Sequence, residues 1–174
     1  MMNADAIQRA VRRMAREIAE RAGPGELAIV GIRRGGVHLA ERLRRELTAS
    51  GKEPPLGTLD IALYRDDLSE RASAPVVGPT DIPFSITGKT IVLVDDVLYT
   101  GRTVRAALDE LVDFGRPRRV LLAVLVDRGG RELPIAADVT GAQVAVPEAE
   151  QVEVRLTEGG APEDAVVVKA RGHT

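Results

Sequence analysis

The sequence predicts an α/β protein with a mostly parallel sheet flanked by helices. Apolar runs without polar alternation, at residues 27–30, 91–94 and 120–126, are typical of strands buried on both faces of a sheet. Helical patterns follow the first two runs, so strand, loop and helix alternate along the chain. The 174 residues, 44% hydrophobic and 29% charged, fit one globular domain over 1–174.

The N-terminal segment predicts an amphipathic helix from Asp5 to Arg21. Four apolar residues at helical spacing form one stripe, namely Ile7, Val11, Met14 and Ile18. Four arginines lie largely off that stripe, namely Arg9, Arg12, Arg13 and Arg16. We interpret these arginines as a solvated face, with a surface that meets a polyanion as the alternative.

A strand at 27–30, a turn at 31–36 and a second helix from Val37 to Leu47 follow. Glycines let the backbone approach a ligand, and the start of a helix attracts anions. An ordinary turn with exposed arginines explains the stretch equally well by itself. The candidate anion-binding residues here are Arg33, Arg34, Gly35 and Gly36.

Residues 51–57 read as a linker, and Leu59 to Tyr64 as a strand of period two. Arg65 comes next, and no periodicity is visible from there to about Pro83. A long irregular insertion after a strand end predicts a mobile loop that closes over a site, with a disordered surface loop as the alternative.

The segment from Ile91 to Thr103 carries the clearest chemical signal, because an apolar strand leads directly into Asp95 and Asp96. Two adjacent acids can hold Mg²⁺, act as a general acid and base, or accept hydrogen bonds from two ribose hydroxyls. The metal-binding interpretation is weakened because the chain has no Gly-x-x-x-x-Gly-Lys-Ser/Thr loop.

The turn that follows favours the ribose interpretation. The hydroxyls of Thr100 and Thr103, with the amides of Gly101 and Arg102, are suited to hold a 5′-phosphate at a helix start. A helical pattern then runs to Gly115.

A third polar loop, 127–134, follows the strand at 120–126. The loops after Val30, Val94 and Val126 should meet at one edge of the sheet, because the carboxyl ends of parallel strands lie together. Three short strands are predicted in the C-terminal part, at 143–146, 152–156 and 165–168.

Composition excludes several classes of function. The absence of cysteine excludes disulfides and thiolate catalysis, and two histidines make a transition-metal site improbable. No apolar run approaches the ~20 residues that span a bilayer, and the N-terminus lacks a signal peptide's apolar core. We therefore predict a cytoplasmic protein without membrane contact. A net charge of −2 provides no general attraction to nucleic acid.

The segment 92–103 resembles the phosphoribosyl pyrophosphate (PRPP) motif of type I phosphoribosyltransferases: an apolar run, two acids, apolar residues and Thr-Gly-x-Thr. Three further stretches, 59–67, 80–84 and 122–134, resemble the PyrR family, whose members are pyrimidine operon attenuators and uracil phosphoribosyltransferases. The similarity covers most of the chain between Leu27 and Ile135.

This resemblance implies a type I phosphoribosyltransferase fold with a mobile loop and a small hood at about 127–150. It implies that uracil and PRPP react to give UMP and pyrophosphate, that Mg²⁺ binds through PRPP without direct protein ligands, and that the protein forms a dimer or larger homo-oligomer. The implied catalytic residues are Arg65, Asp95 and Asp96. The implied substrate-binding residues are Arg33, Arg34, Gly35, Gly36, Asp95, Asp96, Val97, Leu98, Tyr99, Thr100, Gly101, Arg102, Thr103, Asp127 and Arg128.

Three stretches depart from the family pattern: the first lies in the pyrophosphate loop, where the change resembles other type I enzymes, and the loss of cationic and polar groups bears on RNA binding. The loop arginine, Arg34, lies one position early, Gly130 replaces a histidine, and Gly-Ala-Gln at 141–143 replaces Gly-Lys-Asn, with Glu148 and Glu150 beyond. Loss of cations weakens contacts with RNA phosphates. Two hypotheses follow. The first is an enzyme that makes UMP, with regulation of pyrimidine genes through leader mRNA as a second activity. The alternative is a UMP-sensing RNA-binding attenuator with little enzymatic role.

Overall fold

The computed structural model describes residues 1–61 and 80–172. Its centre is a five-stranded sheet of order β2-β1-β3-β4-β5, in which every neighbouring pair is parallel. The predicted α/β architecture is therefore confirmed. The strands are β1 (Leu27–Ile32), β2 (Leu56–Leu59), β3 (Thr90–Leu98), β4 (Arg119–Asp127) and β5 (Val139–Gln143).

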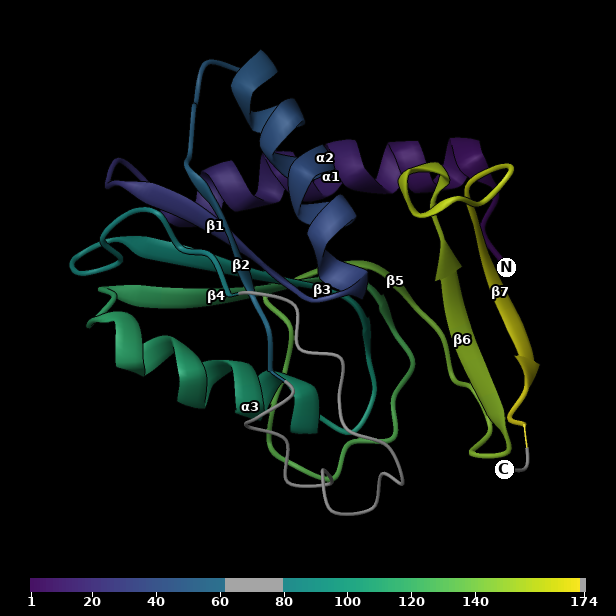
Figure 1. Cartoon of the computed structure of the whole chain (residues 1–174). Helices are drawn as coiled ribbons and strands as arrows, with labels where there is room; N and C mark the ends of the chain where they lie inside the picture. The colour runs from purple at the N-terminus through teal and green to yellow at the C-terminus, as the bar shows by residue number, and fades with distance from the viewer. Residues whose placement is uncertain (62–79, 173–174) are drawn as a thin grey trace.

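Helices cover both faces of this sheet (Figure 1). Helices α1 (Ala4–Ala22) and α2 (Gly35–Ala49) lie on one face, and α3 (Arg102–Leu111) lies on the other. Each face has its own apolar cluster, with Met14 and Leu43 in one and Ile91 and Leu111 in the other. Because both faces are covered, the central strands carry continuous apolar runs.

The predicted first helix is confirmed as α1. The Asn3 side chain caps it by accepting a hydrogen bond of 2.9 Å from the Ala6 amide, which satisfies a donor that the first helical turn leaves free. All four residues of the predicted stripe are buried.

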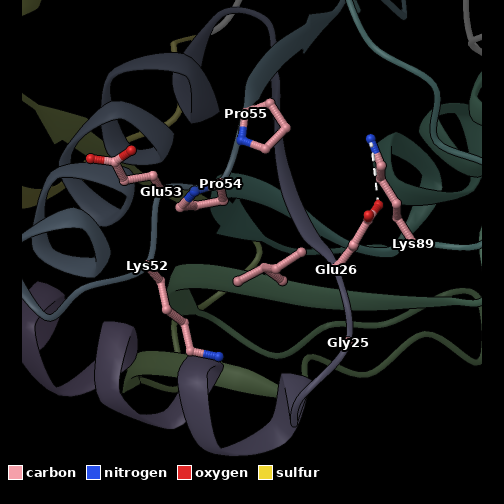
Figure 2. A pocket seen from close by; sticks show the side chains of 8 residues that line it. Gly25, Glu26, Lys52, Glu53, Pro54, Pro55 and Lys89 are labelled. Atoms are coloured by element: carbon pink, nitrogen blue, oxygen red, sulfur yellow. Dashed lines mark ion pairs between the residues drawn. The ribbon is translucent and has the colours of Figure 1, made fainter.

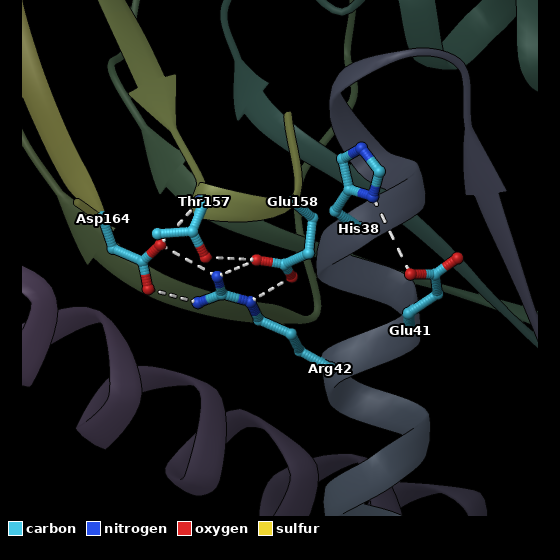
Figure 3. Close-up of polar contacts among 6 residues, drawn as sticks. All are labelled: His38, Glu41, Arg42, Thr157, Glu158 and Asp164. Carbon is cyan, nitrogen blue, oxygen red and sulfur yellow. Dashed lines mark hydrogen bonds and ion pairs between the residues drawn. The ribbon is translucent and has the colours of Figure 1, made fainter. Parts of the chain in front are cut away.

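A two-stranded antiparallel hairpin of β6 (Glu150–Arg155) and β7 (Ala165–Ala170) lies beside the sheet (Figure 1). Arg42 of α2 joins it to the main body (Figure 3). The guanidinium donates to Glu158 at 2.7 Å and to Asp164 at 2.7 Å, in the segment that connects the two strands. The hydrogen bonds from Arg42 outweigh burial and lower the pKa of Glu158 to about 2.

A buried acid on the other face was not expected from the sequence. Glu110 of α3 is 5% exposed and accepts a hydrogen bond of 2.7 Å from the Thr80 hydroxyl. The same hydroxyl accepts one from the Asp60 amide at 2.9 Å. Burial raises the pKa of Glu110, although the bond from Thr80 opposes this.

Three sequence expectations about the elements are wrong. A strand was predicted from Leu59 to Tyr64, but the strand in this region covers 56–59, where it pairs with 29–32 of β1. Residues 62–64 of the predicted strand lie outside the described part. The strand predicted at 143–146 is found at 139–143, where Val139 pairs with Ala123. The helix predicted to reach Gly115 ends at Leu111 in a 3-10 turn (Val112–Phe114).

The strand order places the candidate site. From β1 the chain crosses to β2 on one side, and from β3 it crosses to β4 on the other, so the order reverses between β1 and β3. Open α/β sheets bind ligands at such a reversal, outside the carboxyl ends of the strands. The expectation that the polar loops after β1, β3 and β4 meet at one edge is confirmed, because these strands are neighbours and parallel.

Candidate active site

The two acids lie inside β3, which continues past them to Leu98. Asp95 is 6% exposed and Asp96 is half-buried. The carboxylate of Asp95 accepts the Asp96 amide at 2.8 Å, and that of Asp96 accepts the Val97 amide at 2.8 Å. Each carboxylate is thus held by the amide of the next residue, which fixes its orientation before any ligand arrives.

The glycines of the first loop lie directly against these acids. Helix α2 begins at Gly35, so Gly35 and Gly36 form its first turn. A β-carbon at residue 36 would overlap the carbonyl oxygen of Val94, and one at residue 35 would overlap the carboxylate of Asp96. The positive end of the helix dipole therefore lies beside the acid pair, where an anion can bind.

The two arginines of this loop differ in exposure. Arg33 is half-buried and its amide donates to the Leu59 carbonyl at 2.8 Å, whereas Arg34 is exposed. The peptide bond between them is cis.

The predicted phosphate turn (residues 100–103) and the end of β3 before it present carbonyls to the hood. Because C=O and N–H point in opposite directions across a trans peptide, the amides of residues 99–101 point away from the hood. This orientation leaves them available to an anion. The Leu98 carbonyl accepts the Arg128 amide at 3.1 Å, and the Tyr99 carbonyl accepts the Arg131 guanidinium at 2.8 Å. The Thr100 carbonyl accepts two amides, those of Glu132 at 2.9 Å and Leu133 at 3.1 Å.

Gly101 caps α3 in the left-handed region, with φ at 93°. A β-carbon there would lie 3.1 Å from Ile135. Arg102 pairs with Glu132 at 3.1 Å, and its amide donates to the Thr100 hydroxyl at 3.3 Å. The turn is therefore braced by contacts with Ile135 and Glu132 of the hood.

Asp127 ends β4 and holds the start of the hood. Its carboxylate accepts the Gly129 amide at 3.0 Å and the Arg131 guanidinium at 2.5 Å. Burial acts to raise the pKa of Asp127, but these two hydrogen bonds and the positive charge of Arg131 lower it overall. The group is thus an ionised acceptor at neutral pH.

The side chain of Arg128 has partners other than those expected for a base contact. It is 3% exposed, and its guanidinium carbon lies 3.9 Å from the centroid of the Tyr99 ring. Its donors reach main-chain carbonyls within the hood, namely Val146, Pro147 and Glu150.

Gly130 follows in the left-handed region with φ at 80°, and a β-carbon there would lie 2.6 Å from the Tyr99 ring. The histidine of the family pattern therefore has no room at this position without a shift of the ring. The ring and Gly130 fit each other, which the sequence did not reveal.

The predicted site residues are distributed as follows. The first loop, the acid pair and the phosphate turn come together at one edge, with the hood behind the turn. Arg65 lies outside the described residues. Within 1–61 and 80–172, no three or more acidic or histidine side chains are grouped to hold a metal ion.

A hollow of about 410 Å³ opens at the opposite edge of the sheet (Figure 2). It is lined by residues 25–27 ahead of and at the start of β1, by 52–55 ahead of β2, and by Lys89 ahead of β3. These are amino ends of strands, so the hollow is separate from the acid pair. Its charged lining residues have both signs, for example Lys52 and Glu53.

Comparison with known proteins agrees with this geometry. Residues 3–154 match the model of the phosphoribosyl transferase domain. A hypoxanthine-guanine phosphoribosyltransferase from Bacillus anthracis superimposes with a TM-score of 0.68 at 19% identity, over 83% of this chain and 82% of that one. A hypoxanthine phosphoribosyltransferase from Trypanosoma cruzi, solved with the product IMP, gives 0.65 at 19% identity, over 86% and 76%. Fold and site thus define a phosphoribosyltransferase domain.

Sequence relatives narrow the class. The chain is 56% identical over 170 residues to the bifunctional protein PyrR of a Roseiflexus species, covering 97% of this chain and 93% of the relative. It is 57% identical over 160 residues to that of Thermus thermophilus, covering 91% and 88%. The chain belongs to the PyrR family of phosphoribosyltransferases. None of the helices in the described part has the length and apolar composition to cross a bilayer.

Proposed function

We propose that the protein is a uracil phosphoribosyltransferase, which converts uracil and PRPP to UMP and pyrophosphate, and that it also regulates pyrimidine genes. The observation that carries the enzymatic proposal is the meeting of Asp95 and Asp96 with two anion-binding turns at the switch point of the sheet. Membership of the PyrR family, whose members are named bifunctional, supports both activities.

The three parts of PRPP have counterparts at this edge. The phosphate turn holds the 5′-phosphate through the amides that face away from the hood. Asp95 and Asp96 accept hydrogen bonds from the ribose hydroxyls. The first turn of α2, with Arg33 and Arg34, holds the pyrophosphate.

Mg²⁺ would be held at this edge through PRPP. It prefers hard oxygen ligands in octahedral geometry and keeps several waters, so phosphates supply much of its shell. Asp95 and Asp96 are occupied with the ribose hydroxyls, so the ion would be held through the phosphates of PRPP and water and not by direct protein ligands. When bound, the ion would supply positive charge that offsets the negative charge of the pyrophosphate.

Uracil binds on the hood side of the acid pair. The ionised carboxylate of Asp127 is an acceptor for an N–H of the base. The reaction at the ribose C1′ develops positive charge while pyrophosphate leaves, so the work of the protein is positioning and electrostatic stabilisation. We also propose that Arg65 opens a loop that closes over the pyrophosphate and excludes water from it.

The decisive experiment offers uracil, hypoxanthine, guanine and orotate separately, with PRPP and Mg²⁺, and measures the initial rate of nucleotide formation. We expect UMP as the main product. No product above background with any base would reject the enzymatic proposal and favour the attenuator with little enzymatic role. A faster rate with a purine would reject the base assignment only.

Regulation through leader mRNA is the second proposed activity. Homo-oligomerisation and a cytoplasmic location stay predictions.

A further inference from the structure

The guanidinium of Arg128 joins the two ends of the hood to the phosphate turn. Its Nη1 donates to the Glu150 carbonyl at 2.8 Å, and its Nη2 donates to those of Val146 at 3.2 Å and Pro147 at 3.1 Å. Its guanidinium carbon lies over the Tyr99 ring, 3.9 Å from the ring centroid. The side chain is 3% exposed, and both of its terminal nitrogens are already engaged with main-chain carbonyls.

Tyr99 is held from several directions. Its carbonyl accepts the Arg131 guanidinium at 2.8 Å, and Gly130 leaves the space that the ring edge occupies. The guanidinium carbon of Arg171 also lies 5.3 Å from the ring centroid, just past the end of β7. The ring thus contacts segments that are far apart in sequence, and Arg128 is the contact that also fixes the far end of the hood.

We infer that Arg128 is a positioning residue, which sets the place of the uracil-binding hood relative to the 5′-phosphate turn through the Tyr99 ring. This inference rests on the proposed function. It replaces the role expected for Arg128 from the sequence, which was direct contact with substrate. Because the base and the phosphate belong to one nucleotide, a shift between hood and turn should weaken both subsites together.

Arginine is suited to this task and lysine is not. A guanidinium can stack on an aromatic face while it donates in its own plane to several carbonyls. An ammonium is a point charge that cannot hold both sets of contacts in one geometry. Arg128→Lys therefore keeps the charge and removes the connection between the Tyr99 ring and residues 146–150, while the main-chain hydrogen bonds between hood and turn remain.

The test measures the KM for PRPP, the KM for uracil and kcat for the wild type, Arg128→Lys, Tyr99→Leu and the double variant. We expect both KM values to rise roughly tenfold in Arg128→Lys, since small misplacements of binding groups are costly. We expect the double variant to be no worse than Tyr99→Leu alone, since both changes break one connection. Arg155→Lys is the matched control, because Arg155 is exposed on β6 and pairs with the surface acid Glu153. We expect wild-type kinetics for this variant.

A spectroscopic readout supports the kinetic one. The chain has no Trp and two Tyr, so Tyr64→Phe leaves Tyr99 as the only strong fluorophore. In that background, Arg128→Lys should change the Tyr99 emission and Arg155→Lys should not. Unchanged emission would count against the stack, and a change confined to Arg128→Lys would support it.

Four outcomes separate the possibilities. Reduced melting temperature or kcat with unchanged KM values would overturn the inference, because a purely structural role lowers the amount of active protein and leaves KM alone. A rise in the KM for uracil only would overturn it in favour of direct base contact. If the wild type forms no UMP, the proposed function fails, and UMP affinity by calorimetry then decides the inference. Weaker UMP binding by Arg128→Lys would uphold it, and equal binding would overturn it.

Discussion

Gly35 lies so close to Asp96 that a β-carbon on the glycine would overlap the carboxylate. The start of α2 and the acid pair of β3 therefore form one unit. Glycine is needed at residue 35 because any larger side chain would collide with the Asp96 carboxylate. A carboxylate is the end of a side chain and can rotate away, so Gly35→Ala is expected to displace Asp96 more than to unfold the protein.

We predict that Gly35→Ala lowers kcat/KM for PRPP by about a hundredfold, because a displaced acid no longer meets the ribose hydroxyls. Steady-state kinetics and thermal melting measure the two effects separately. Gly159→Ala is the control, since it lies in a turn with nothing within 4 Å of the added carbon. An active Gly35→Ala enzyme would mean that Asp96 tolerates the shift.

Replacement of both acids by Asn tests their role directly. Asn retains an oxygen that can accept the amides of Asp96 and Val97, which the carboxylates now accept at 2.8 Å. We expect a melting temperature close to that of the wild type and a loss of PRPP turnover of at least about a hundredfold. Unchanged turnover would show that the acids do not hold the ribose.

Arg42 should stabilise the hairpin of β6 and β7 in a pH-dependent manner. We predict that Arg42→Met lowers the free energy of unfolding at pH 7 by about 1–2 kcal/mol, because Glu158 and Asp164 lose their shared partner. Urea unfolding measures this. Arg155→Met is the control, since the pair of Arg155 with Glu153 is exposed and should contribute under about 0.5 kcal/mol.

The pH dependence has a definite sign. Hydrogen bonds from Arg42 lower the pKa of Glu158 from 4.5 to about 2, so its stabilising contribution is present above pH 4.5 and is lost as the pH falls towards 2. The difference between wild type and Arg42→Met should shrink over that window. A constant difference from pH 7 to pH 2 would contradict the assignment.

RNA binding should be weak. Of the arginines on α1, Arg13 is engaged with the Thr140 and Gly141 carbonyls and with Glu17, and Arg12 pairs with Glu46 at 3.9 Å. Acidic residues 148 and 150 lie in the hood. We predict a Kd for leader RNA weaker than about 1 µM at physiological salt, measured by gel shift with and without UMP.

A matched variant restores one cation for the same assay. Ala142→Lys returns the lysine of the family pattern and should strengthen binding and steepen its salt dependence. Tight, UMP-enhanced binding by the unmodified protein would overturn the prediction. It would also give the regulatory activity more weight.

The sequence predicted best those elements whose pattern of apolar residues has only one physical explanation. Strands β1, β3 and β4 are buried on both faces, and the stripe of α1 is repeated over several turns. The edge strands β2 and β5 were misplaced because each is short, and its position depends on the neighbour with which it pairs. Val112 fits the apolar side of α3 by period but is 66% exposed, because the helix ends before it.

The sequence by itself indicated the buried strands, the polar loops at their carboxyl ends, and the Asp95-Asp96 pair followed by a turn suited to bind phosphate. These features are local, since each depends on neighbours within a few residues. Only the tertiary structure decided that Gly35 faces Asp96, that Gly130 faces the Tyr99 ring, and that Arg128 is buried. An arginine in a predicted binding loop has the same local signature whether it meets a ligand or the protein's own carbonyls. The difference lies in the distant segment 146–150 that folds back over it.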